Sequence, residues 1–158
     1  MSSTAPLISQ FKGDTVTPSD TDEYPLAIAR FAGNAERRAK LVAFVRDAHD
    51  VVLAINYAKE HRLPIAIKGG GHNSAGASSV KDGLVIDLSR YLNKVTVDPE
   101  QRLAYVGGGA LWDAVDRECI KYGLATVAGT VNNVRLYFYF YHILILFFFF
   151  RREWEGSF

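Results

Sequence analysis

One segment of the chain carries apolar residues at helical spacing. Four of them stand at i, i+3, i+4 and i+7 and would form one buried stripe: Val51, Ala54, Ile55 and Ala58. Asp47 precedes the stripe as a helix N-cap, and Asp50, three residues later, partly imitates a capping box. Because Pro64 cannot continue a helix, we predict that this helix ends near His61.

Short apolar runs of strand length surround this helix. The predicted strands are 39–45, 64–67, 83–88, 94–97, 103–106 and 124–127. The turn at 98–101, with Pro99 in its second position, fits type I geometry and joins the fourth and fifth strands into a hairpin. A second helix is predicted to begin after the glycines 107–109 and to end at Gly123. Its inward residues are expected to be Leu111, Ala114 and Val115.

Strands and helices alternate over residues 31–133, and two glycine runs lie at junctions between them. This order predicts an α+β domain of small sheets with surrounding helices, and it does not fit a helical bundle or a sandwich. Residues 1–30 are mostly polar and are predicted to be an N-terminal lead-in, with a short helix starting near Asp20.

Residues 136–150 interrupt this pattern, because they contain no charge and no turn former. A membrane anchor is one interpretation, but the run is shorter than the ~20 residues that span a bilayer. A buried strand or helix is the second, although four consecutive phenylalanines favour aggregation if uncovered. The third, which we favour, is translation of an unspliced intron, since Phe, Tyr, Ile and Leu codons are T-rich. Residues 134–158 are therefore expected to lie outside the domain.

Composition narrows the possible functions. The 158 residues carry a formal net charge of +1, with both signs spread along the chain, so no nucleic-acid partner is expected. The single cysteine, Cys119, excludes an internal disulfide framework and a cysteine-rich metal site. The histidines His49, His61 and His142 do not have the spacing of metal ligands, so no metal is expected. Residues 1–12 lack an apolar core of signal-peptide length, which favours a cytoplasmic protein, and a membrane partner is not expected.

The glycines 69–71 directly follow the predicted strand 64–67. A turn without Cβ atoms can adopt positive φ and direct backbone N–H groups at an anion such as a nucleotide diphosphate. The spacing fits neither a P-loop nor G-x-G-x-x-G, because Ser74 stands at the third glycine position. On spacing alone, a tight turn and a phosphate-binding loop remain equally good interpretations.

The segment 63–76, Leu-Pro-Ile-Ala-Ile-Lys-Gly-Gly-Gly-His-Asn-Ser-Ala-Gly, resembles the cofactor loop of flavoproteins of the vanillyl-alcohol oxidase type. Within that superfamily it is most similar to the berberine-bridge-enzyme and 6-hydroxy-D-nicotine oxidase group. Further similar segments follow in the family's order: 83–89, 95–98, 104–112 and 122–132. The resemblance covers about Phe31 to Asn132. It implies a PCMH-type FAD-binding domain of an FAD-dependent oxidoreductase, incomplete at its C-terminus.

The resemblance also implies roles for individual residues. His72 would bond covalently to the 8α-carbon of the flavin, whereas without the resemblance it would be a solvated loop histidine. Lys68, where the family more often has Arg, would offset phosphate charge. The other residues expected to contact FAD are Gly69, Gly70, Gly71, Asn73, Ser74 and Gly76, with Gly129, Thr130 and Val131 near the flavin ring or the adenine side.

The resemblance identifies no catalytic residue, because the family's substrate pocket comes largely from another domain. A complete protein would remove a hydride from a small organic substrate and pass it to the flavin, then to dioxygen or another acceptor. Two alternatives remain open at this point. One is a non-catalytic nucleotide-binding module anchored to a membrane through 136–150, and the other is a non-functional fragment.

Overall fold

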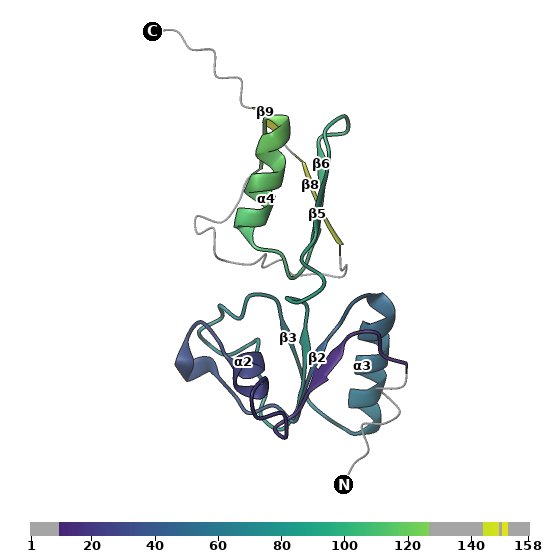
Figure 1. Cartoon of the computed structure of the whole chain (residues 1–158), viewed down its shortest axis with the longest axis vertical. Helices are drawn as coiled ribbons and strands as arrows, with labels where there is room; N and C mark the ends of the chain where they lie inside the picture. The colour runs from purple at the N-terminus through teal and green to yellow at the C-terminus, as the bar shows by residue number, and fades with distance from the viewer. Residues whose placement is uncertain (1–9, 127–143, 149, 152–158) are drawn as a thin grey trace.

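The computed structural model describes residues 10–126, 144–148 and 150–151, which form two lobes joined by the chain after β4 (Figure 1). The first lobe contains β1 (Asp14–Val16), α2 (Tyr24–Ile28), a 3-10 turn (Gly33–Ala35), β2 (Leu41–Phe44), α3 (Ala48–Glu60), β3 (Ile65–Lys68) and β4 (Leu84–Asp87). The second contains β5 (Val95–Asp98), β6 (Leu103–Gly107), α4 (Trp112–Cys119), a 3-10 turn (Ile120–Tyr122), β7 (Leu124–Ala125), β8 (Leu144–Phe148) and β9 (Phe150–Arg151). The predicted α+β class is confirmed.

The first lobe is built on a four-stranded sheet in the order β1-β2-β4-β3. The strands β2, β4 and β3 are parallel, with Leu84 of β4 facing Leu41 and Ile65, and β1 runs antiparallel to β2. Every residue of β2 and β4 is buried, as expected for central parallel strands covered on both faces. Since the three strands are parallel, their carboxyl ends lie at one edge of the sheet.

A helix packs on each face of this sheet. The face under α3 has a core of Leu41, Ala43, Val45, Leu84 and Ile86 with Ala54, Tyr57 and Ala58 of the helix. The opposite face has a core of Val16, Val42, Phe44, Ala66 and Val85 with Tyr24 and Ala27 of α2. In the predicted stripe of α3, Ala54 and Ala58 are buried, and Val51 and Ile55 are partly buried against the core.

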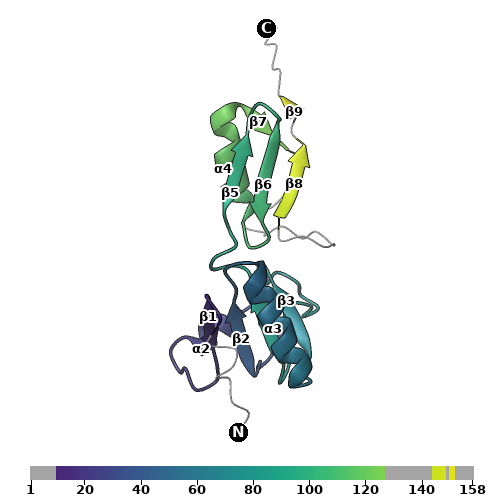
Figure 2. The same cartoon turned by 90° about the vertical axis from the view of Figure 1, so that its right-hand side faces the viewer.

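The second lobe packs α4 against an antiparallel sheet in the order β5-β6-β8 (Figure 2). Its core contains Ala104, Val106, Ala110, Trp112, Val115, Cys119 and Leu124. The predicted inward residues of α4 are confirmed only for Val115, because Leu111 and Ala114 are partly exposed. Gly123 ends the helical segment with φ +64°, as predicted for a left-handed cap.

Glycine is required at Gly107 and Gly109, where the two lobes meet. A Cβ at Gly107 would lie 2.2 Å from the carbonyl oxygen of Leu92, and one at Gly109 would lie 2.1 Å from that of Leu88. Both carbonyls belong to the segment that leaves β4. The backbone of the turn before α4 therefore lies directly against the connection between the lobes.

The prediction that residues 1–30 are a lead-in is wrong for residues 14–28. β1 pairs with β2 from Asp14↔Phe44 to Val16↔Val42, and Val16 is buried in the core. Tyr24 is also buried, and its hydroxyl donates to the carbonyl of Ala39 at 2.7 Å. The short helix predicted near Asp20 is observed as α2, which begins at Tyr24. The three-residue strand β1 is too short to show hydrophobic periodicity, so only its long-range pairing reveals it.

Part of the aromatic run forms secondary structure. β8 pairs antiparallel with β6, from Leu103↔Phe148 to Gly107↔Leu144, and β9 pairs with β7. Residues 144–148 thus form a strand of the second lobe, and the expectation that residues 134–158 lie outside the domain is wrong for this strand. In the parts of the chain that the structure describes, no helix is long and apolar enough to cross a membrane.

Candidate functional site

The glycine loop lies at the carboxyl edge of the parallel strands. Residues 69–76 follow β3, and the segments after β2 and β4 leave the sheet at the same edge. In Figure 1 the chain passes from this edge of the first lobe into the second lobe. Ligands of open α/β sheets bind outside the carboxyl ends of the strands. The predicted loop is therefore in the position that such a site requires.

Two glycines of the loop have left-handed backbone conformations. Gly71 has φ +72° and Gly76 has φ +86°, so they bracket His72, Asn73, Ser74 and Ala75. Asn73 closes the turn between them, because its backbone carbonyl accepts from Gly76 N at 3.2 Å and its Oδ1 accepts from Ala77 N at 3.0 Å. The expectation of positive φ in the glycine run 69–71 is confirmed at Gly71, and Gly76 adds a second such position.

Lys68, at the end of β3, forms a buried ion pair. Its Nζ lies 2.7 Å from Oδ2 of Asp87, the last residue of β4, and the two side chains are 11% and 0% exposed. The other carboxylate oxygen of Asp87 accepts from Ser89 N at 2.8 Å. The sequence suggested that Lys68 offsets the charge of a phosphate. In the structure its charge is already matched by the carboxylate of Asp87. The pair ties the first residue of the loop to the neighbouring strand.

Arg30 contributes a second, buried cation beside the loop. Its Nε and Nη2 donate to the carbonyl of Ser78 at 3.1 and 2.7 Å. Its Nη1 donates to the carbonyls that end α2, those of Ala27, Ile28 and Ala29, at 3.3, 2.8 and 2.8 Å. Burial lowers the pKa of the Arg30 guanidinium, against the effect of Asp87 and Glu36, which raise it.

Arg30 also packs against the centre of the loop. A Cβ at Gly71 would lie 3.0 Å from the Cδ of Arg30, so the arginine stem fills the space where a side chain would stand. This contact and the positive φ both require glycine at this position. The sequence analysis missed Arg30, because one arginine in a polar segment shows no pattern that separates it from a solvated one.

Phe31 lies on the imidazole of His72. The ring centroids are 5.0 Å apart with an interplanar angle of 28°, and Phe31 N donates to the carbonyl of Gly71 at 3.2 Å. Phe31 is 79% exposed, and His72 is partly buried. Arg30 thus contacts the loop at Gly71 and binds the carbonyl of Ser78 just after it. Phe31 contacts the loop at Gly71 and His72.

The loop region offers polar groups that a cofactor diphosphate can use. Within the described residues, the buried Ser78 Oγ and Ser79 Oγ have no hydrogen-bond partner. Buried hydroxyls are normally hydrogen-bonded, so an unpaired one beside a glycine turn is a candidate ligand group. These two serines were missed in the sequence. Glycine backbone without side chains and the two unpaired hydroxyls together fit an anionic nucleotide cofactor.

A cavity of about 300 Å³ lies at the same sheet edge. Its lining comprises Glu23, Leu26, Ala27, Phe44, Lys68, Ser89 and Arg90. It touches the predicted site only at Lys68. Gly129, Thr130 and Val131, which were predicted to lie near the flavin, are outside the described residues.

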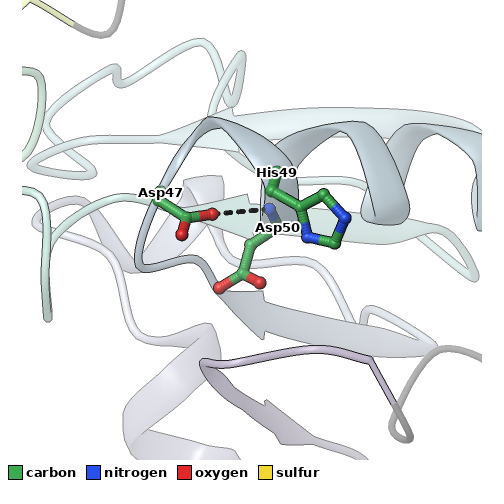
Figure 3. Close-up of side chains that lie close together, drawn as sticks. All are labelled: Asp47, His49 and Asp50. Carbon is green, nitrogen blue, oxygen red and sulfur yellow. Dashed lines mark hydrogen bonds between the residues drawn. The ribbon is translucent and has the colours of Figure 1, made fainter.

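Asp47, His49 and Asp50 form a cluster whose potential ligand atoms lie within 4.8 Å of one another (Figure 3). The oxygens of Asp47 accept from Asp50 N at 3.0 Å and from the Nζ of Lys12 at 2.6 Å. Those of Asp50 accept from Lys12 N at 3.0 Å and from Arg46 N at 2.9 Å. The cluster therefore serves as the predicted N-cap of α3 and holds the segment before β1, and we assign no metal to it.

Comparisons with known proteins agree with this geometry. A family model described as FAD binding domain matches residues 39–134. The FAD-linked oxidoreductase YgaK of Bacillus subtilis is 37% identical over 128 residues, which are 81% of this chain and 28% of that protein. The (R)-6-hydroxynicotine oxidase of Paenarthrobacter nicotinovorans is 32% identical over 129 residues, 82% of this chain and 28% of the oxidase.

A solved structure is similar over most of the chain as well. The crystal structure of 6-hydroxy-D-nicotine oxidase from Arthrobacter nicotinovorans superposes with a TM-score of 0.79 at 30% identity. The superposition covers 85% of this chain and 29% of the oxidase. The chain therefore spans less than a third of the length of these relatives.

Proposed function

The chain belongs to the family of FAD-binding domains found in FAD-linked oxidoreductases, and from this premise we propose that it is the flavin-binding part of such an enzyme. The observation that carries the proposal is the loop after β3, where the left-handed Gly71 and Gly76 bracket His72 at the carboxyl edge of the parallel strands. This loop lies within the residues that the family model matches.

In this proposal, some residues of the loop contact FAD and others hold the loop in place. The diphosphate would lie on the backbone of the glycine run 69–71, which carries no side chains of its own. Asn73 and Ser74, with the unpaired hydroxyl of Ser78, supply further hydrogen-bonding groups. The pair of Lys68 and Asp87 fixes the start of the loop, and Arg30 fixes its end. When bound, the flavin supplies the capacity to accept a hydride.

We propose in addition that His72 is the covalent attachment point of the flavin. One C–H bond of the 8α-methyl group and the N–H bond of the imidazole break, and one N–C bond forms. The two electrons and two protons released reduce dioxygen to hydrogen peroxide, so the step is balanced. The support for this assignment is the place of His72 between the two left-handed glycines, with its ring partly accessible.

In the complete protein, the flavin would take a hydride from a small organic substrate and pass the electrons to dioxygen or another acceptor. Two of the relatives are named as oxidases of a hydroxynicotine, which is a small molecule of this kind. The substrate pocket would come largely from the part of those relatives that this chain does not span.

Flavin content and its stability to acid test both proposals. The purified protein is expected to bind FAD and to retain yellow colour in the pellet after acid precipitation. His72→Ala should lose the acid-stable colour and keep reversible binding, whereas His49→Ala, which changes an exposed histidine on α3, should behave as the wild type. A protein that ignores added FAD contradicts the binding proposal, and acid-stable flavin on His72→Ala contradicts only the tether.

A further inference from the structure

We propose that Phe31 is a positioning residue that holds the His72 imidazole in the orientation needed for bonding to the flavin. This inference rests on the proposed role of His72 and adds a residue to it. Phe31 does not touch the reacting atoms in this proposal. It acts by restricting the ring that does.

The contact between the two rings leaves the reactive edge of the imidazole free. Stacking at 5.0 Å between centroids and 28° between planes covers a face of the His72 ring. The ring nitrogens lie at its edge, and among the described residues neither takes part in a hydrogen bond. The stack is thus the directional contact that the structure provides for this side chain. An imidazole without it would rotate among its rotamers before reacting.

The backbone of Phe31 is held at its own N–H group and at the preceding residue, which gives the ring a fixed base. Its N–H donates to the carbonyl of Gly71, the residue just before His72. The preceding Arg30 is buried, and its guanidinium donates to four carbonyls on two segments. The phenyl ring and the imidazole therefore project from two backbone segments that are joined by the hydrogen bond between Phe31 N and the carbonyl of Gly71, next to His72.

Phe31 is also suited to a clean experiment, because its side chain is 79% exposed and belongs to none of the three core clusters. Removing an exposed ring costs little folding free energy, so a loss of attachment in a Phe31 variant will not follow from unfolding. The stacking energy of one aromatic pair corresponds to a change of about two- to tenfold in the rate of attachment, if the stack is present in the transition state.

The experiment follows the growth of acid-stable flavin after FAD is added to the flavin-free protein. Phe31→Ala should attach FAD about two- to tenfold more slowly than the wild type, with a reversible dissociation constant within about twofold of it. Phe31→Tyr keeps a stacking ring and should restore the rate. Ile120→Ala changes another exposed apolar residue, 75% exposed on the second lobe, and should have no effect.

A second measurement does not depend on the flavin. The ring current of Phe31 should shift the imidazole proton resonances of His72 upfield, and Phe31→Ala should remove that shift while Ile120→Ala leaves it unchanged. Attachment by Phe31→Ala at the wild-type rate overturns the inference, as does a spectrum without the shift. Failure of the tether itself is separate, since it appears as acid-stable flavin on His72→Ala or as none on the wild type.

Discussion

The buried pair at the root of the loop gives a prediction about stability. Asp87→Asn removes the negative charge and keeps an oxygen in place to accept from Ser89 N. The ammonium of Lys68 then remains almost fully buried beside a neutral amide whose NH₂ group is also a donor. Breaking a buried ion pair by removing one partner costs about 3–5 kcal/mol. Since Lys68 keeps 11% side-chain exposure, we expect a loss near the lower end of that range, about 3 kcal/mol.

Urea denaturation followed by circular dichroism measures this cost, and a double-mutant cycle assigns it to the pair. Lys68→Met should also destabilise the protein, because within the described residues the Asp87 carboxylate then keeps one hydrogen-bond donor, Ser89 N. The double variant Lys68→Met, Asp87→Asn removes both charges of the pair and should be more stable than the sum of the two single losses indicates. If each single variant loses less than about 1 kcal/mol of unfolding free energy and the two losses add without coupling, the reasoning is refuted, because such values are typical of a solvent-exposed ion pair.

Three further predictions concern other parts of the chain. Burial raises the pKa of the Cys119 thiol to about 11, so a thiol reagent at mildly alkaline pH should label the protein only after denaturation, and rapid labelling of the native state contradicts this. The Tyr91 hydroxyl lowers the pKa of the Asp14 carboxyl below its ordinary value. The stability difference between wild type and Asp14→Asn should therefore shrink as the pH falls below about 4, and a difference independent of pH is the opposing result. Comparing cDNA with genomic sequence around codon 133 should reveal an intron boundary, whereas a major transcript that runs uninterrupted through residues 134–158 rules it out.

Local patterns predicted the helices and the strands β2 to β7, but not β1, β8 or β9 and not the arrangement of the strands. The stripe of α3 and its cap at Asp47 depend on residues within one or two turns, so the sequence contains all that is needed to predict them. The order β1-β2-β4-β3 depends on pairings between distant segments, for which hydrophobic runs give no register. In α4 the burial of Trp112 and Cys119 follows from packing on a sheet whose position the sequence does not indicate.

The candidate site divides in the same way. The glycine run and His72 are contiguous, so the loop could be predicted from the sequence. Phe31 lies 41 positions before His72, and Arg30 lies 48 positions before Ser78. Neither residue stands in a pattern that marks it, and only the folded chain brings them to the loop. Lys68 was assigned to phosphate because its partner, Asp87, is 19 positions away on another strand.

Equilibrium titration with FAD tests the central claim, that the loop between Gly71 and Gly76 binds the cofactor. Gly71→Ala forces a side chain into a left-handed backbone position beside Arg30, whereas Gly33→Ala adds a Cβ where nothing lies within 4 Å. The wild type and Gly33→Ala should bind one FAD per chain, and Gly71→Ala should bind it about tenfold or more weakly. A wild-type chain that binds no FAD, or a Gly71→Ala chain that binds it as tightly as the wild type, would contradict the claim.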